Sequence, residues 1–143
     1  GDELVSRLSK KAESLKVGPG MDKSSEMGPL VTKEHLEKVK GYVDLGVKEG
    51  AKLIVDGRNL KLQGYENGFY IGGCLFDNVT KNMRIYKEEI FGPVLSVVRA
   101  KNFEEATQLV NDHEFGNGVS IFTRDGDSGR AFSSKVKINC LHT

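Results

Sequence analysis

Residues 86–94 read Tyr86-Lys87-Glu88-Glu89-Ile90-Phe91-Gly92-Pro93-Val94. Two carboxylates lead into an apolar pair, a Gly-Pro bend follows, and the apolar run that begins at Val94 is typical of a strand. A carboxylate beside an aromatic ring at the end of a strand can bind a sugar, because the carboxylate accepts hydrogen bonds from hydroxyls while the ring packs against the attached base. A solvated pair of glutamates ahead of a core strand is the simpler interpretation, and residue chemistry alone favours it.

The residues after Val94 alternate between strand and helix patterns. The expected elements are a strand over 94–100, a helix over 103–113, a strand over 118–123, a helix over 127–135 and a strand over 136–140. Strands that alternate with helices of about ten residues indicate parallel pairing through right-handed crossovers. Asn102 followed by Glu105 resembles a capping box, and Asp125 or Asp127 can cap the next helix.

The residues before this stretch carry two amphipathic helix patterns, over 2–16 with Asp2 as its cap and from Thr32 to Gly50. We also expect strands over 51–56 and 69–76, a hairpin or excursion over 57–68, and a short helical turn over 80–88. The sequence therefore predicts an α/β fold over residues 1–143: a single domain of three layers, with a mostly parallel sheet and flanking helices.

The composition excludes several classes of partner. The 143 residues include 21 Lys and Arg against 20 Asp and Glu, so the formal net charge is +1 and gives no electrostatic reason to bind nucleic acid or an anionic membrane. No apolar run approaches the ~20 residues of a membrane-spanning helix. No secretory signal is visible, and the expected compartment is the cytoplasm, with the mitochondrial matrix as the alternative.

The two cysteines do not form a disulfide framework. Cys74 lies in an apolar run and is expected to be a buried, inert thiol, whereas Cys140 lies close to the C-terminus. The three histidines lack the spacing of zinc ligands, so no metal site is expected. The run from Asp125 to Gly129 fits a turn and helix cap, because an EF-hand loop needs other residues at its fifth and twelfth positions.

The run from Glu88 to Val94 resembles the signature of the aldehyde dehydrogenase superfamily. Further matches are Met27-Gly28-Pro29-Leu30-Val31 and Ile121-Phe122-Thr123. The resemblance implies that Glu89 holds the nicotinamide ribose of NAD and that Phe91 lies near the nicotinamide. It also implies that positions matching His35 and Lys38, one turn apart on a helix, approach the nucleotide from the side. A solvated helix face is the alternative for Lys38.

Two further runs resemble the methylmalonate-semialdehyde dehydrogenases, the CoA-acylating branch of that superfamily. They are Gly64-Tyr65-Glu66-Asn67-Gly68 and Phe115-Gly116-Asn117-Gly118. The resemblance implies that a small-molecule substrate, methylmalonate or malonate semialdehyde, is oxidised with NAD and CoA to propionyl-CoA or acetyl-CoA, with loss of the carboxyl group as carbon dioxide. Tight turns with positive φ explain the same residues without any branch assignment. A branch that hydrolyses its thioester and a non-catalytic remnant are the alternatives.

The resemblance also implies that this chain is the C-terminal portion of a catalytic domain. In the family the nucleophilic cysteine precedes the segment matching 2–17, and most of the NAD-binding domain lies upstream. We therefore expect the isolated chain to be inactive, with Cys74 not in the nucleophile's place, and the parent enzyme to be a homotetramer. No catalytic residue is assigned within the chain.

Overall fold

The computed structural model describes residues 1–137, 141 and 142. The chain divides into two compact units, Gly1–Val98 and Arg99–Thr143, and each is described by itself. Among the described residues, no helix has the length and apolar character needed to cross a membrane. The single domain expected over 1–143 stays a prediction.

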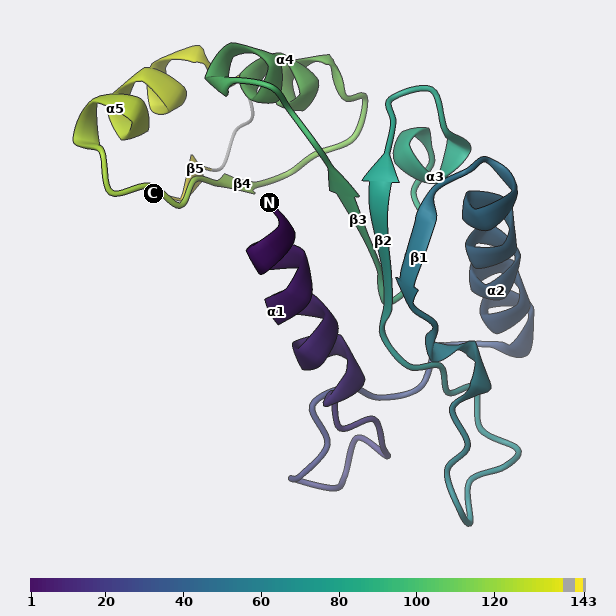
Figure 1. Cartoon of the computed structure of the whole chain (residues 1–143). Coiled ribbons are helices and arrows are strands. Elements are labelled where there is room, and N and C mark those ends of the chain that lie inside the picture. The colour runs from purple at the N-terminus through teal and green to yellow at the C-terminus, as the bar shows by residue number, and fades with distance from the viewer. Residues whose placement is uncertain (138–140, 143) are drawn as a thin grey trace. The chain divides into compact units, whose positions relative to one another are not determined.

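The first unit contains three helices, three strands and one 3-10 turn (Figure 1). In chain order they are α1 (Asp2–Glu13), α2 (Lys33–Lys48), β1 (Lys52–Val55), η1 (Gly57–Asn59), β2 (Cys74–Val79), α3 (Arg84–Lys87) and β3 (Val94–Val98). The sheet order is β1-β2-β3, with β2 and β3 parallel and β1 antiparallel to β2. The antiparallel pair was not predicted; it arises because a loop with one 3-10 turn joins β1 to β2 in place of a crossover helix.

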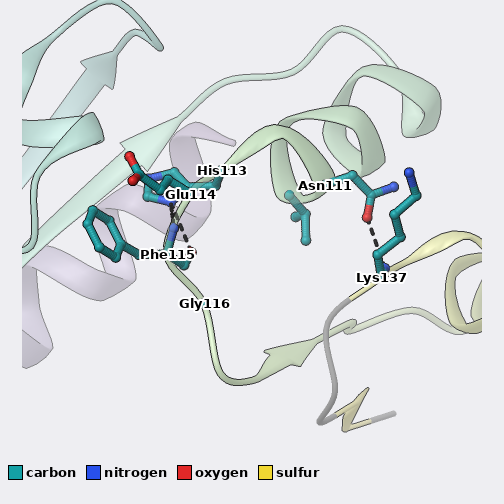
Figure 2. Close-up of a pocket in the computed structure, with 7 residues that line it drawn as sticks. Asn111, His113, Glu114, Phe115, Gly116 and Lys137 are labelled. Carbon is teal, nitrogen blue, oxygen red and sulfur yellow. Dashed lines mark hydrogen bonds between the residues drawn. The ribbon is translucent and has the colours of Figure 1, made fainter.

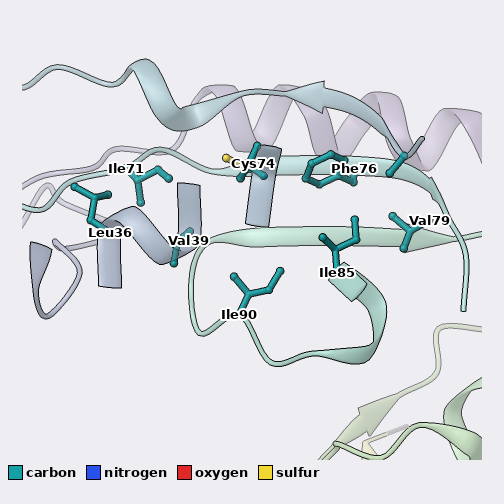
Figure 3. Packing of buried hydrophobic residues seen from close by; sticks show 10 residues of the cluster. Leu36, Val39, Ile71, Cys74, Phe76, Val79, Ile85 and Ile90 are labelled. Carbon is teal, nitrogen blue, oxygen red and sulfur yellow. The ribbon is translucent and has the colours of Figure 1, made fainter. Parts of the chain in front are cut away.

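Helices cover both faces of this sheet, which confirms the three-layer α/β fold. On one face, Val5 of α1 packs with Val55 and Leu75. On the other face, α2 and α3 contribute Val39 and Ile85 to the larger core cluster (Figure 3). β2 lies between the two helix layers and is buried on both sides, as expected for a central strand.

The strand expected over 69–76 is wrong in its bounds, because β2 runs from Cys74 to Val79. Asn78 has a φ of 57°, and the pairing with β3 shifts register between Phe76 and Val79. This irregularity breaks the two-residue alternation, so Phe76 and Val79 both lie in the core cluster on the α2 side although they are three residues apart. The polar residues of this bulge hide the end of the strand from a pattern search.

Side-chain caps fix most helix starts as predicted. Thr32 accepts a hydrogen bond from the His35 amide, Asn102 accepts one from the Glu105 amide at 2.8 Å, and Asp125 accepts from the amides of Asp127 and Ser128. The cap expected of Asp2 is wrong. Gly1 is the N-cap of α1, and Asp2 is its first helical residue, where its charge complements the helix dipole.

The run from Gly64 to Gly68 forms two consecutive turns. The Tyr65 amide donates to the Leu62 carbonyl at 3.0 Å, and the Gly68 amide donates to the Tyr65 carbonyl at 2.9 Å. The positive φ expected for this run is found at Gly64, with 82°, and not at Gly68. Turn chemistry therefore accounts for Gly64 without any ligand.

The second unit contains α4 (Phe103–Asp112), β4 (Val119–Ser120), α5 (Gly126–Lys135) and β5 (Leu141–His142), with β4 and β5 parallel. The side-chain amide of Asn111 joins α4 to the end of α5. Its Nδ2 donates to the Lys135 carbonyl at 2.9 Å. Its Oδ1 accepts from the backbone amide of Lys137 at 3.0 Å (Figure 2). The strand expected over 136–140 falls partly on residues 138–140, and these, with Cys140, lie outside the described residues.

Candidate functional site

One face of α2 holds the segment from Glu88 to Gly92. His35, Val39 and Tyr42 are spaced four and three residues apart, so they lie on one side of the helix. Tyr42 contacts Glu88 and His35 contacts Phe91 through hydrogen bonds, while Val39 lies in the same core cluster as Ile90 (Figure 3). The segment thus runs along the helix and is attached to it at each end.

Glu88 is fully engaged by neighbouring donors. The Tyr42 hydroxyl donates to its Oε2 at 2.6 Å, and the Arg84 guanidinium donates from Nε to Oε1 at 2.7 Å and from Nη2 to Oε2 at 3.1 Å. Arg84 first and Tyr42 second stabilise the ionised form and lower the pKa of Glu88 from 4.5 to about 2. The same hydrogen bond raises the pKa of Tyr42. This carboxylate has little capacity left for a ligand.

Glu89 is different, since its side chain is exposed. Among the residues that the structure describes, none hydrogen-bonds to its carboxylate. Two free carboxylate oxygens beside each other can accept from two neighbouring hydroxyl groups. Of the two consecutive glutamates, only the second therefore has the capacity to bind a diol.

Phe91 has an unusual backbone conformation, with a φ of 54°, and its side chain is 73% exposed. The left-handed region costs an L-residue about 1–2 kcal/mol, so the surrounding structure has to stabilise it. His35 Nε2 donates to the Phe91 carbonyl at 2.6 Å. At the next residue, a Cβ on Gly92 would lie 2.6 Å from one γ-carbon of Val39, so only glycine fits there.

Lys38 lies on the same side of α2 and is exposed. Its Nζ is 5.7 Å from the centroid of the Tyr42 ring, a distance that fits a cation–π contact. The sequence predicted that His35 and Lys38 face one ligand. In the structure His35 turns toward the Phe91 carbonyl, whereas the Lys38 ammonium is accessible, and its contact with a ligand stays a prediction.

A model of the aldehyde dehydrogenase family matches residues 1–143, the whole chain. The chain belongs to the aldehyde dehydrogenase family. A malonate-semialdehyde dehydrogenase of Pseudomonas aeruginosa is 54% identical over 140 residues, which are 98% of this chain and 28% of that protein. A bovine mitochondrial protein named methylmalonate-semialdehyde/malonate-semialdehyde dehydrogenase [acylating] is 44% identical over 95% of this chain and 25% of its own length.

Solved aldehyde dehydrogenases share the fold. A Sinorhizobium meliloti protein described as a methylmalonate-semialdehyde dehydrogenase, complexed with NAD, superimposes with a TM-score of 0.94 and 56% identity over 98% of this chain and 29% of that one. A Mycobacterium tuberculosis aldehyde dehydrogenase complexed with NAD gives a TM-score of 0.90 and 34% identity over 98% of this chain and 29% of that one. The chain thus spans less than a third of the length of these relatives.

Sequence reasoning missed the residues of this aldehyde dehydrogenase segment that support the glutamates. Tyr42 and Arg84 hold Glu88, and Val39 receives Gly92. Two spacings in the sequence could have indicated these supporting residues. Arg84 and Glu88 are four residues apart at a short helix, and His35, Val39 and Tyr42 share a helix face.

Cys74 is buried, as predicted, with 2% of its surface exposed. Burial raises the pKa of its thiol, and the Gly57 amide donates to its Sγ at 3.3 Å. A neutral and inaccessible thiol is a poor nucleophile. Cys74 therefore does not fit the role of the reactive cysteine of an aldehyde dehydrogenase.

The Glu88 network predicts a specific dependence of stability on pH. Because the pKa of Glu88 is lowered from 4.5 to about 2, its stabilisation is fully present above pH 4.5 and is lost as the pH falls through about 2. Glu88→Gln cannot titrate. The difference in free energy of unfolding between the wild type and Glu88→Gln, measured in urea, should therefore shrink between pH 4.5 and 2.

The matched control is Glu13→Gln, which changes an exposed glutamate on α1. The free energy of unfolding of Glu13→Gln should depend on pH in the same way as that of the wild type. A difference between wild type and Glu88→Gln that stays constant from pH 6 to pH 2 would show that the carboxylate is not held by Arg84 and Tyr42.

Proposed function

We propose that this chain forms part of an NAD-dependent enzyme that oxidises malonate or methylmalonate semialdehyde. In this proposal the chain supplies the side of the cofactor site that faces the nicotinamide riboside. Glu89 accepts hydrogen bonds from the two ribose hydroxyls, Phe91 packs near the nicotinamide, and Lys38 approaches the nucleotide from the side.

The observation that carries this proposal is the contrast between the two consecutive glutamates. Glu88 is engaged by Arg84 and Tyr42, while Glu89 is exposed and precedes by two residues Phe91, whose ring is also exposed. A free carboxylate next to an exposed ring fits a nucleoside, whose sugar offers two donors and whose base offers a flat apolar face. Relatives solved with NAD support the identity of the nucleotide.

NAD, when bound, accepts a hydride from the substrate. The part of this chain is to orient that cofactor. Glu89 would fix the position of the ribose by two hydrogen bonds to its hydroxyls, and with it the point from which the attached ring extends. Phe91 limits the position of the ring from one side and excludes water there, and both effects favour a geometry in which hydride transfer is possible.

The relatives also support CoA as the acyl acceptor, since the bovine protein carries the word acylating in its name. A thioester formed on an enzyme cysteine is open to attack by a second thiol, which returns the cysteine and releases an acyl-CoA. We expect the complete enzyme to turn over malonate semialdehyde much faster with CoA than without, with acetyl-CoA, NADH and carbon dioxide from the lost carboxyl group as the products. NADH absorbance and mass spectrometry of the products measure this.

Reactions without CoA serve as the control for a hydrolytic route. Equal rates with and without CoA, with free acid as the product, would contradict the acylating assignment and favour a branch that hydrolyses its thioester. Succinate semialdehyde, which is one methylene longer, serves as the substrate control and should react more slowly.

The isolated chain is proposed to be inactive. Cys74 is the one cysteine among the described residues, and its buried neutral thiol cannot serve as the nucleophile. We also propose that the complete enzyme is a homotetramer and that it acts in the cytoplasm. The mitochondrial matrix is the alternative compartment, in line with the name of the bovine relative.

A further inference from the structure

We infer that His35 is a positioning residue: its Nε2–H holds the Phe91 carbonyl and thereby keeps Phe91 in the left-handed conformation that presents its ring to the cofactor. The inference rests on the proposed function in so far as the ring serves the nicotinamide. The backbone geometry on which it depends does not require that function.

The first step is the conformation of Phe91. Asn78 and Phe91 are the non-glycine residues with positive φ in the part of the chain that the structure describes. Asparagine adopts this conformation comparatively often because its short polar side chain bonds locally, whereas an aromatic residue does so rarely. A bulky residue in this region marks a site where neighbouring contacts impose the geometry.

The second step is the source of that constraint. Downstream, the Cys74 amide donates to the Pro93 carbonyl at 2.8 Å, which ties Pro93 to the sheet. Upstream, Ile90 is buried in the core with 9% of its surface exposed. Between these two anchors, the polar side-chain contact to the peptide that follows Phe91 is the 2.6 Å hydrogen bond from His35.

The third step is the chemistry of His35. A carbonyl oxygen only accepts hydrogen bonds, so Nε2 has to carry the proton, either in the neutral Nε2–H tautomer or in the charged ring. The position of His35 is itself fixed, since its backbone amide donates to the Thr32 hydroxyl oxygen at 3.1 Å as part of the cap of α2. The start of α2 thus sets the conformation of Phe91 through one imidazole.

The test uses the complete enzyme that contains this chain. His35→Leu removes the donor, whereas His35→Gln places an amide N–H at a similar reach. A net hydrogen bond of ordinary strength predicts that His35→Leu slows single-turnover NADH formation roughly 3- to 10-fold, while His35→Gln stays within about twofold of the wild type. Lys33→Leu, on the same turn but exposed, is the matched control and should keep the wild-type rate.

Crystal structures of the same variants without NAD give a readout that does not depend on activity. We expect the φ of Phe91 to leave the positive region in His35→Leu and to stay there in His35→Gln. If His35→Leu does not fold, His35→Asn, whose donor is too short to reach the carbonyl, replaces it with the same expected result. A positive φ in the variants without the donor, or an equal loss of rate in the Leu and Gln variants, would overturn the inference.

Failure of the proposed function is recognised separately. If Glu89→Gln leaves NAD binding and hydride transfer unchanged, the cofactor assignment fails. The effect of His35 on the φ of Phe91 would still be decided by the crystal structures of the His35 variants.

Discussion

Glu89→Gln in the complete enzyme should slow hydride transfer about 10- to 100-fold, because it keeps the shape of the side chain and removes the charge that accepts from two hydroxyls. Hydrogen bonds to charged groups contribute about 1.5–3 kcal/mol, and about 1.4 kcal/mol is a factor of ten in rate. The effect should appear in the rate of single-turnover NADH formation, with a smaller loss of NAD affinity, since the carboxylate acts mainly through cofactor geometry.

The matched control is again Glu13→Gln, which makes the same replacement at an exposed position on α1. It should keep the wild-type rate and the wild-type NAD affinity. A Glu89→Gln enzyme that also keeps both would show that the assignment of Glu89 is wrong and that the pair of glutamates serves stability alone.

Phe76→Ala should lower the free energy of unfolding by about 3–5 kcal/mol, the range found for removal of a fully buried aromatic side chain. Phe76 has no exposed surface and lies in the core cluster with Val43, Ile85 and Val79. A Cβ added to Gly46 of α2 would lie 2.8 Å from its ring, so the helix packs tightly against it. Urea unfolding of the chain, followed by circular dichroism, measures the loss.

Phe122→Ala provides the matched control, because it deletes the same ring from a side chain that is 95% exposed. Its effect on the free energy of unfolding should stay within about 0.5 kcal/mol. If Phe76→Ala lowers the free energy of unfolding by less than about 1 kcal/mol, the Phe76 ring is not tightly packed between α2 and β2 as described.

The helices and the layer order of the fold follow from patterns that depend on nearby residues. The apolar positions of α2 recur at helical spacing, and its capping residue Thr32 stands at the expected place. The path of β2 depends instead on contacts far apart in the sequence. The bulge at Asn78 and the antiparallel pairing with β1 are set by packing against α2 and by the loop between the strands, and no local pattern encodes them.

The candidate site likewise has features that the sequence predicts and features that depend on residues far apart in the sequence. Glu89 and Phe91 stand out in the sequence because a carboxylate and a ring occur together just before the start of a strand. Which of the two glutamates is free cannot be read from the sequence, because Tyr42 lies 46 residues from Glu88 and reaches it only in the folded chain. The left-handed conformation of Phe91 is likewise set by His35, which lies 56 residues away.

The most direct test of the central claim is a crystal structure of the complete enzyme with NAD bound. We predict that the two hydroxyls of the nicotinamide ribose lie within about 3 Å of the Glu89 carboxylate, while Glu88 keeps its hydrogen bonds to Tyr42 and Arg84. A ribose held by Glu88, or a Glu89 side chain that points away from the bound cofactor, would contradict the account.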